Sequence, residues 1–203
     1  MYPGRDIRWY NEESKKMSRR DRGMLLDIDY SESAEAKVFY EFQEKNKVVN
    51  LPFNAKSIIL FWDFGSVDAT AVVFANVTRE YDDKEKKMLL RIYLKSVVQD
   101  WNTDYEKMSR AVRDELKRIG FRGTTRGIRC IGGYDVKNTQ VATGKKLGEY
   151  YADEGFNIEP TPYHETKTVL DQANLIMREC NLFVENECEL LTEAIDEIGR
   201  AHV

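Results

Sequence analysis

The hydrophobic pattern of the chain is most regular between residues 57 and 98, where three runs have the character of β-strands. Residues 57–63 are almost wholly apolar up to Asp63, residues 70–77 are rich in β-branched side chains, and residues 88–98 alternate between two faces. Continuous apolar runs are typical of a central strand covered on both faces, whereas alternation is typical of a half-covered strand. Short polar turns join the three runs, so we predict an antiparallel meander.

After residue 100 the pattern changes to helices that alternate with short strands. Residues 103–119 place apolar side chains at three- and four-residue steps, start with a Thr103–Glu106 capping-box pattern and stop at Gly120. Further helices are predicted at 139–153, 167–179 and 188–195, and extended segments at 128–134, 156–160 and 182–184. This order predicts an α/β fold: a mixed sheet of three antiparallel strands and then strands parallel to the first, with flanking helices.

The N-terminal part of the chain lacks this regularity. Residues 1–50 are charged and irregular, so we expect a linker or docking arm with a short helix over 12–26 and an edge strand or docking segment over 37–42. The regular pattern predicts a single domain over 51–196.

Composition narrows the class of protein. A chain of 203 residues with 42% hydrophobic and 33% charged residues is typical of a soluble globular protein. No apolar run approaches the ~20 residues that span a bilayer, so no membrane partner is expected. Three cysteines without zinc-type spacing indicate a reducing compartment. The net charge of −4 argues against a strongly basic nucleic-acid binder, although local basic patches such as 19–22 remain compatible with one.

Two aspartates carry the candidate chemistry. Asp63 and Asp135 each follow an apolar strand directly, and the carboxyl ends of parallel strands are where open α/β sheets bind ligands. Like charges held together repel unless they are protonated or bridged by a cation. Oxygen ligands without His or Cys favour Mg²⁺ or Mn²⁺, and two such ions suit phosphodiester cleavage. The alternative is that both aspartates are turn residues that close their strands.

Several colinear segments resemble one known family. They are 62–65 (Trp-Asp-Phe-Gly), 68–71 (Asp-Ala-Thr-Ala), 133–135 (Gly-Tyr-Asp), 26–31 and the stretch 169–191. Together they resemble the C-terminal nuclease domain of the large terminase subunit of tailed bacteriophages, a member of the ribonuclease-H-like superfamily.

The resemblance implies a ribonuclease-H-like fold and a metal-dependent endonuclease that cuts concatemeric DNA during genome packaging. By position, Asp63 matches the acid of the first strand and Asp135 the acid of the fourth, so both would be catalytic ligands of two Mg²⁺ or Mn²⁺ ions. The implied partners are double-stranded DNA, the terminase ATPase domain, the small terminase subunit and the portal. The implied location is the host cytoplasm.

The chain departs from the family pattern in two ways. The family's further acid lies in a C-terminal helix, yet Asp171 comes too early to match it and Asp196 is the only other late aspartate. The Gly-rich phosphate loop of the packaging ATPase is also missing from the sequence. We therefore expect a fragment that lacks its ATPase and is truncated at the C-terminal side of the nuclease domain.

The last residues support the same expectation. Residues 197–203 can be encoded by a nucleotide sequence that resembles a widely used sequencing adapter, so we expect a non-native tail in which His202 has no function. His164 is expected in a surface loop, Cys130 in the core, and Lys137 near a phosphate backbone.

Two other functions remain open from the sequence. A nuclease-like domain without its third acid would serve as a docking module for a portal or small-subunit partner. The turn 63–66 also resembles the first phosphate loop of actin and sugar-kinase-type ATP-binding domains, although those proteins need two similar lobes.

Overall fold

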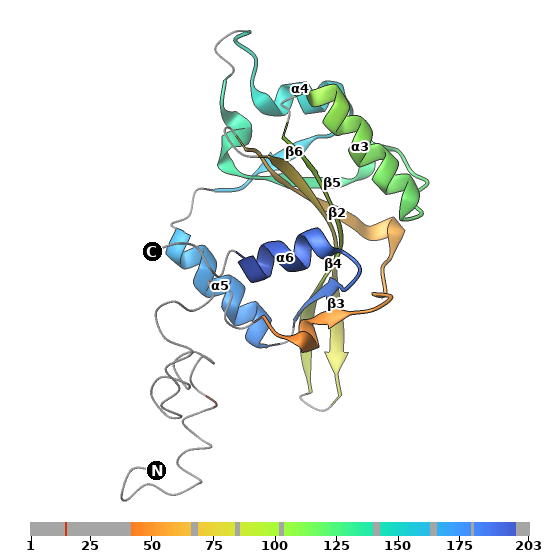
Figure 1. Ribbon diagram of the computed structural model, residues 1–203, viewed down its shortest axis with the longest axis vertical. Coiled ribbons are helices and arrows are strands. Elements are labelled where there is room, and N and C mark those ends of the chain that lie inside the picture. The colour runs from red at the N-terminus through yellow and green to blue at the C-terminus, as the bar shows by residue number, and fades with distance from the viewer. Residues whose placement is uncertain are drawn as a thin grey trace, which may run out of the picture.

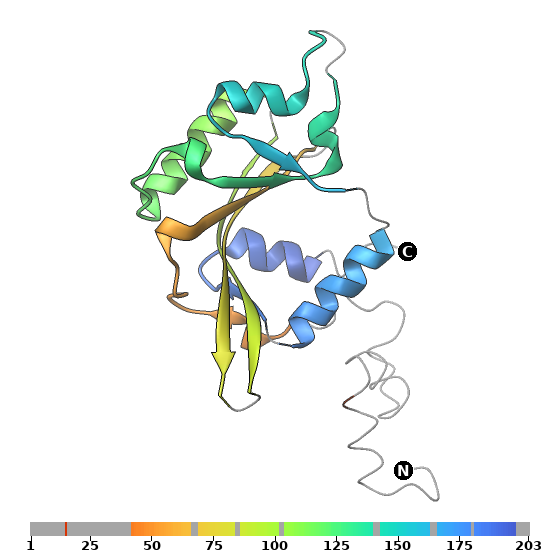
Figure 2. The ribbon, with the colours of Figure 1, turned by 180° about the vertical axis from the view of Figure 1, so that it is seen from behind.

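The computed structural model describes residue 15 and residues 42–65, 69–83, 86–101, 104–139, 143–162, 166–179 and 181–197. Within these ranges the chain forms a seven-stranded mixed sheet with helices packed against it (Figures 1 and 2). The strands are β1 (Lys47–Val48), β2 (Ile58–Asp63), β3 (Thr70–Asp82), β4 (Lys87–Asp100), β5 (Arg129–Gly132), β6 (Ile158–Pro160) and β7 (Leu182–Glu185). The helices are α3 (Tyr105–Arg118), α4 (Leu147–Asp153), α5 (Thr166–Arg178) and α6 (Glu189–Glu197).

The sheet order is β1-β7-β4-β3-β2-β5-β6. Strands β2, β3 and β4 form the predicted antiparallel meander. Strand β5 lies parallel to β2, and β6 lies parallel to β5. The predicted α/β fold, with antiparallel strands followed by parallel ones, is confirmed. Strand β7 pairs with β4 on the other side of the meander, and β1 pairs with β7.

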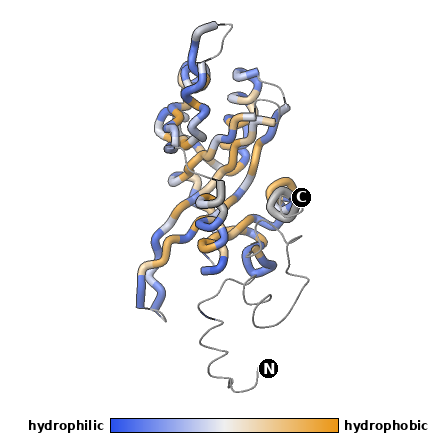
Figure 3. Tube along the Cα trace, turned by 90° about the vertical axis from the view of Figure 1, so that its left-hand side faces the viewer, coloured by the Kyte–Doolittle hydropathy of each residue, from blue (hydrophilic) through white to orange (hydrophobic). Residues whose placement is uncertain are grey.

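Two hydrophobic clusters cover opposite faces of the sheet. The larger contains Val72 and Phe74 of β3 together with the inner residues of α3 and α4. The smaller contains Met177 of α5 and Leu191 of α6, with Val73 of β3 packed against it. Neighbouring residues of a strand point to opposite faces. Val72 and Phe74 therefore point to the face of the larger cluster, and Val73 points to the face of the smaller one. In Figure 3 the orange, hydrophobic positions follow the strands through the centre of the molecule.

Two boundaries near the predicted site differ from the prediction. The fourth strand of the meander-and-crossover pattern was expected over 128–134, but β5 ends at Gly132 and a 3-10 turn, η6 (Tyr134–Lys137), follows it. The helix expected over 139–153 begins only at Leu147. Thr139 instead forms an antiparallel bridge with Lys146, and Gly144 has a φ of 69° that favours a turn over a helix.

The start of α3 also differs from the prediction. The N-cap is Asp104, whose carboxylate accepts a hydrogen bond of 3.0 Å from the Lys107 N–H, so the predicted capping box at Thr103 is wrong. Asp at this position satisfies one of the free N–H groups of the first turn. Thr103 itself lies outside the described residues.

The described part of the predicted N-terminal arm is built into the sheet. Phe42 is buried in the smaller cluster, and the side chain of Asn46 donates a hydrogen bond of 2.8 Å to the carbonyl oxygen of Leu182. The rest of the arm lies outside the described residues except residue 15, which is helical. Residues 198–203 of the predicted tail also lie outside them.

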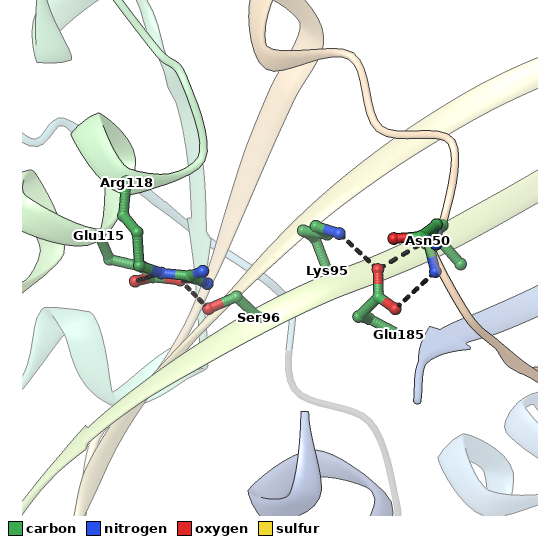
Figure 4. Close-up of polar contacts among 7 residues, drawn as sticks. Asn50, Lys95, Ser96, Glu115, Arg118 and Glu185 are labelled. Carbon is green, nitrogen blue, oxygen red and sulfur yellow. Dashed lines mark hydrogen bonds and ion pairs between the residues drawn. The ribbon is translucent and has the colours of Figure 1, made fainter. Parts of the chain in front are cut away.

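A β-bulge in β4 directs one lysine toward this region. Phe74 pairs with Ser96 and Ala75 with Leu94, so Lys95 is the extra residue of β4. Its ammonium group forms an ion pair with the buried carboxylate of Glu185 (Figure 4). Glu185 also accepts hydrogen bonds of 3.1 Å and 2.9 Å from the N–H groups of Asn50 and Leu51. Lys95 and Glu185 thus fix the chain that leads from β1 to the first strand of the meander.

Of the helices in the described ranges, none combines the length and apolar character needed to cross a lipid bilayer.

Candidate active site

The topology brings the two predicted aspartates to the same edge of the sheet. Strands β2 and β5 are parallel neighbours, with Trp62 opposite Gly132. Asp63 is the last residue of β2, one position after Trp62, and Asp135 lies in η6, directly after β5. Both carboxylates therefore follow the carboxyl ends of adjacent strands, where open α/β sheets bind ligands.

The charge of Asp63 acts on the carboxyl group of Asp135. Asp63 is exposed and Asp135 is half-buried. Burial raises the pKa of Asp135, and the negative charge of Asp63 raises it further, whereas the N–H groups of Asp135 and Val136 act in the opposite direction. Two carboxylates held close together at the edge of a sheet repel each other, and a cation bound between them would remove this repulsion.

The turn that carries Asp135 is held by the side chain of Val136. A Cβ added to Gly132 would lie 2.6 Å from Val136 Cγ2, and a Cβ added to Gly148 would lie 2.7 Å from Val136 Cγ1. Both distances are too short for real atoms, so Val136 fills a socket between β5 and α4 that only glycine leaves open. A Cβ at Gly133 would lie 2.4 Å from Asp135 Oδ1, so a third glycine makes room for the carboxylate itself.

The residue that follows Asp63 packs beside the same socket. Phe64, which follows Asp63, has its Cε2 atom 3.3 Å from where a Cβ of Gly132 would lie. The Phe64 ring also stacks on Trp62, with ring centroids 5.9 Å apart. Trp62 in turn packs against Tyr151 at 4.7 Å. The residues next to Asp63 and next to Asp135 thus pack against the same group of aromatic and apolar side chains. The sequence analysis missed this socket, although the glycines at 132, 133 and 148 were its available signal.

The other residues that the sequence singled out contribute less. Cys130 is buried in the core, as predicted, and burial raises the pKa of its thiol to about 11, which keeps it protonated at neutral pH. Lys137 is exposed in η6 beside Asp135. Asp171 is exposed on α5, which packs against the face of the sheet that the smaller cluster covers. His164 and His202 lie outside the described residues.

The donor set fits part of a divalent-cation site. Asp63 and Asp135 supply carboxylate oxygens at an accessible edge, which is the donor type that Mg²⁺ and Mn²⁺ prefer. In the part of the chain that the structure describes, no group of three or more His, Cys, Asp or Glu side chains is gathered as a metal site. The two aspartates therefore stand as a pair.

Comparison with known proteins places the fold. No protein-family model and no curated protein matches the sequence. Among solved structures, the nuclease domain of the large terminase of phage P22 aligns with a TM-score of 0.57 and 18% identity, covering 80% of each chain. The large terminase of the thermophilic bacteriophage D6E aligns with a TM-score of 0.55 and 8% identity, covering 98% of this chain and 48% of that one.

The present chain thus spans about half the length of the D6E large terminase. The match to the P22 nuclease domain spans four-fifths of both chains. The resemblance noted in the sequence is therefore confirmed at the level of the fold: this chain has the ribonuclease-H-like fold of the nuclease domain of phage large terminase subunits.

Proposed function

We propose that the chain is a metal-dependent endonuclease domain that cuts concatemeric double-stranded DNA for a viral packaging terminase. The observation that carries this proposal is the pairing of Asp63 with Asp135 at the carboxyl ends of neighbouring parallel strands. The fold shared with the P22 nuclease domain supports it.

In this proposal each aspartate has a distinct role. Asp63 is exposed at the end of a buried central strand, so its carboxylate reaches solvent from a rigid position. Asp135 is half-buried, and Val136 holds its turn in place. Both would be ligands of Mg²⁺ or Mn²⁺, which when bound activates a water molecule and stabilises the leaving oxygen of the phosphodiester. A two-ion site needs a further acid, which we expect from outside the described residues.

The proposed partners follow from the same family. They are double-stranded DNA, the ATPase domain, the small terminase subunit and the portal, and the proposed location is the host cytoplasm. The D6E large terminase, whose length is about twice that matched here, supports an arrangement in which a second domain shares the chain with this one.

The test is nicking of supercoiled plasmid in the presence of Mg²⁺ or Mn²⁺. Asp63→Asn and Asp135→Asn should each reduce the nicking rate by more than about 100-fold, because loss of a direct ligand should exceed the 10–100-fold typical of an outer-shell partner. The matched control is Asp114→Asn, which removes an exposed carboxylate on α3 that pairs only with Lys117. An Asp63→Asn protein that nicks plasmid at the wild-type rate would end the assignment.

A second function is favoured by one observation. Because the described residues gather only two carboxylates, the domain would serve as a docking module if no further ligand joins them. Calorimetric titration with Mn²⁺ separates the two cases. Binding that is lost in Asp63→Asn supports the nuclease, whereas a wild-type chain that neither binds Mn²⁺ nor nicks DNA supports the docking module.

A further inference from the structure

We infer that Trp101 is a stacking surface for a DNA base close to the cleaved phosphodiester, with Tyr134 as its counterpart on the other side of the aspartates; this inference rests on the proposed function. Trp101 is 72% exposed, which makes it the most exposed large hydrophobic side chain that the structure describes. Single exposed hydrophobic side chains are ordinary on a protein surface, so the inference depends on where Trp101 lies in the sheet.

The sheet register places Trp101 at the same edge as the aspartates. Strand β4 runs parallel to β2 because both are antiparallel to β3. At this edge Asp63 pairs with Ala71 of β3, and Asp100 pairs with the adjacent Thr70. Gln99, which pairs with Ala71, lies two strand spacings from Asp63, and Trp101 lies two residues beyond Gln99, so the backbones of Trp101 and Asp63 are about 12 Å apart.

The chain that leads into Trp101 is anchored. The carboxylate of Asp100, which is 16% exposed, pairs with the Lys107 ammonium group at 2.9 Å. Asp104 caps the first turn of α3. A platform for stacking needs an exposed ring next to an anchored element, and Trp101 directly follows the anchored end of β4.

Tyr134 provides a second exposed ring across the aspartates. It is 55% exposed and precedes Asp135 in η6. Strands β4 and β5 lie on either side of β2 in the sheet order, so Trp101 and Tyr134 flank Asp63 from opposite sides.

The charge of this edge makes stacking a useful source of affinity. Lys107 already neutralises Asp100, whereas Lys137 beside Asp135 is exposed. The chain as a whole carries a net charge of −4, which weakens binding that relies on phosphate neutralisation. Stacking on an aromatic ring needs no charge and tolerates every base that is unpaired, as in a single strand or at a locally opened duplex. A separation of about 12 Å corresponds to roughly three to four base steps along one strand.

Fluorescence titration of the full chain tests the inference without catalysis. The probes are a single-stranded oligonucleotide and a duplex with a frayed end, each added in Ca²⁺. With Trp9→Phe in every protein compared, the remaining tryptophans are Trp62 and Trp101. The fluorescence should then be quenched on binding, and most of that quench should vanish in Trp101→Phe, because Trp62 is buried. Trp101→Ala should weaken binding about ten-fold, and Trp101→Tyr should restore most of it.

The matched control is Tyr81→Ala. Tyr81 is 57% exposed, close to the value for Tyr134, but it lies near the tip of the β3–β4 hairpin, away from the carboxyl edge (Figure 1). Tyr134→Ala should weaken binding, whereas Tyr81→Ala should not.

The outcomes separate this inference from the proposed function. If Trp101→Ala binds DNA as the wild type does, or if DNA leaves the Trp101 emission unchanged, the stacking role is overturned even where Asp63-dependent nicking persists. If the quench occurs and Asp63→Asn still nicks plasmid normally, the stacking surface stands and the nuclease assignment fails.

Discussion

The side chain of Val136 packs so closely against Gly132 and Gly148 that neither glycine has room for a methyl group. The glycines at 132 and 148 allow its side chain to seat, and its seating fixes the turn that presents Asp135. The sequence predicted that Asp63 and Asp135 would converge because strand order and strand ends are written in the hydrophobic pattern. It could not predict the socket, because the socket forms between residues of β5, η6 and α4 whose contact depends on the folded structure.

A substitution at Gly148 should therefore act on the site. Ala is the better helix former, so in an open position Gly148→Ala would stabilise α4 by up to about 1 kcal/mol. Here the new Cβ meets Val136, and overpacking of this kind costs roughly 1–3 kcal/mol. We expect Gly148→Ala to weaken Mn²⁺ binding by about 10-fold, as loss of outer-shell support does, when measured by calorimetry.

A size exchange provides the control. Adding Val136→Ala to Gly148→Ala removes the clashing methyl groups and should recover part of the Mn²⁺ affinity. Gly127→Ala is the neutral comparison, because nothing lies within 4 Å of its added Cβ. A Gly148→Ala protein with wild-type Mn²⁺ affinity would show that Val136 does not position Asp135.

At the scale of elements, β1 and β7 join the sheet through contacts that local patterns do not encode. The sequence predicted an extended segment over 182–184, and the structure has β7 there, but nothing in the pattern specified its neighbours. Parallel pairing between strands far apart in the chain leaves no turn signal. The bulge at Lys95 was hidden for a related reason, because one extra residue in a long strand changes side-chain direction without changing composition.

The carboxylate of Glu185 should be important for stability. Its side chain is 4% exposed and is satisfied by Lys95 and two backbone N–H groups. Glu185→Ala leaves these donors unpaired, and breaking a buried pair costs about 3–5 kcal/mol. Urea unfolding should reveal this loss, while Glu193→Ala, at an exposed position on α6, should change the unfolding free energy by less than about 0.5 kcal/mol.

The same carboxylate should contribute to acid sensitivity. Burial acts to raise the pKa of Glu185, but Lys95 and the backbone N–H groups outweigh it, so the pKa lies below the ordinary 4.5. A lowered carboxyl pKa contributes stability that is present above the ordinary value and is lost as the pH falls through the folded-state value. Thermal unfolding below about pH 4.5 should therefore show a smaller loss in Glu185→Gln than in the wild type. Equal losses in both proteins would contradict this role.

For the whole molecule, the alternation of strands and helices was sufficient to predict the fold. It did not predict that the segment before residue 51 belongs to the sheet. Its apolar residues, including Phe42, are few and scattered, so no periodicity revealed that residues 42–50 complete the edge of the sheet. The predicted boundary at residue 51 can be examined by shortening the chain.

A chain that starts at residue 42 should keep the stability of the described domain. A chain that starts at residue 51 loses β1 and Phe42, and loss of a buried Phe side chain alone costs roughly 3–5 kcal/mol. We expect a clear difference in thermal unfolding temperature between the two. Equal unfolding temperatures would mean that the arm begins where the sequence pattern suggested.

The pairing of β1 with β7 has a consequence for biosynthesis. Asn46 binds the carbonyl oxygen of Leu182, 136 positions later in the chain. At translation rates of about 5–20 residues per second, the ribosome needs roughly 7 to 27 seconds between making the two partners. During that interval Phe42 lacks the later residues that bury it. The nascent chain is therefore most accessible to proteases and chaperones near the segment that is synthesised first.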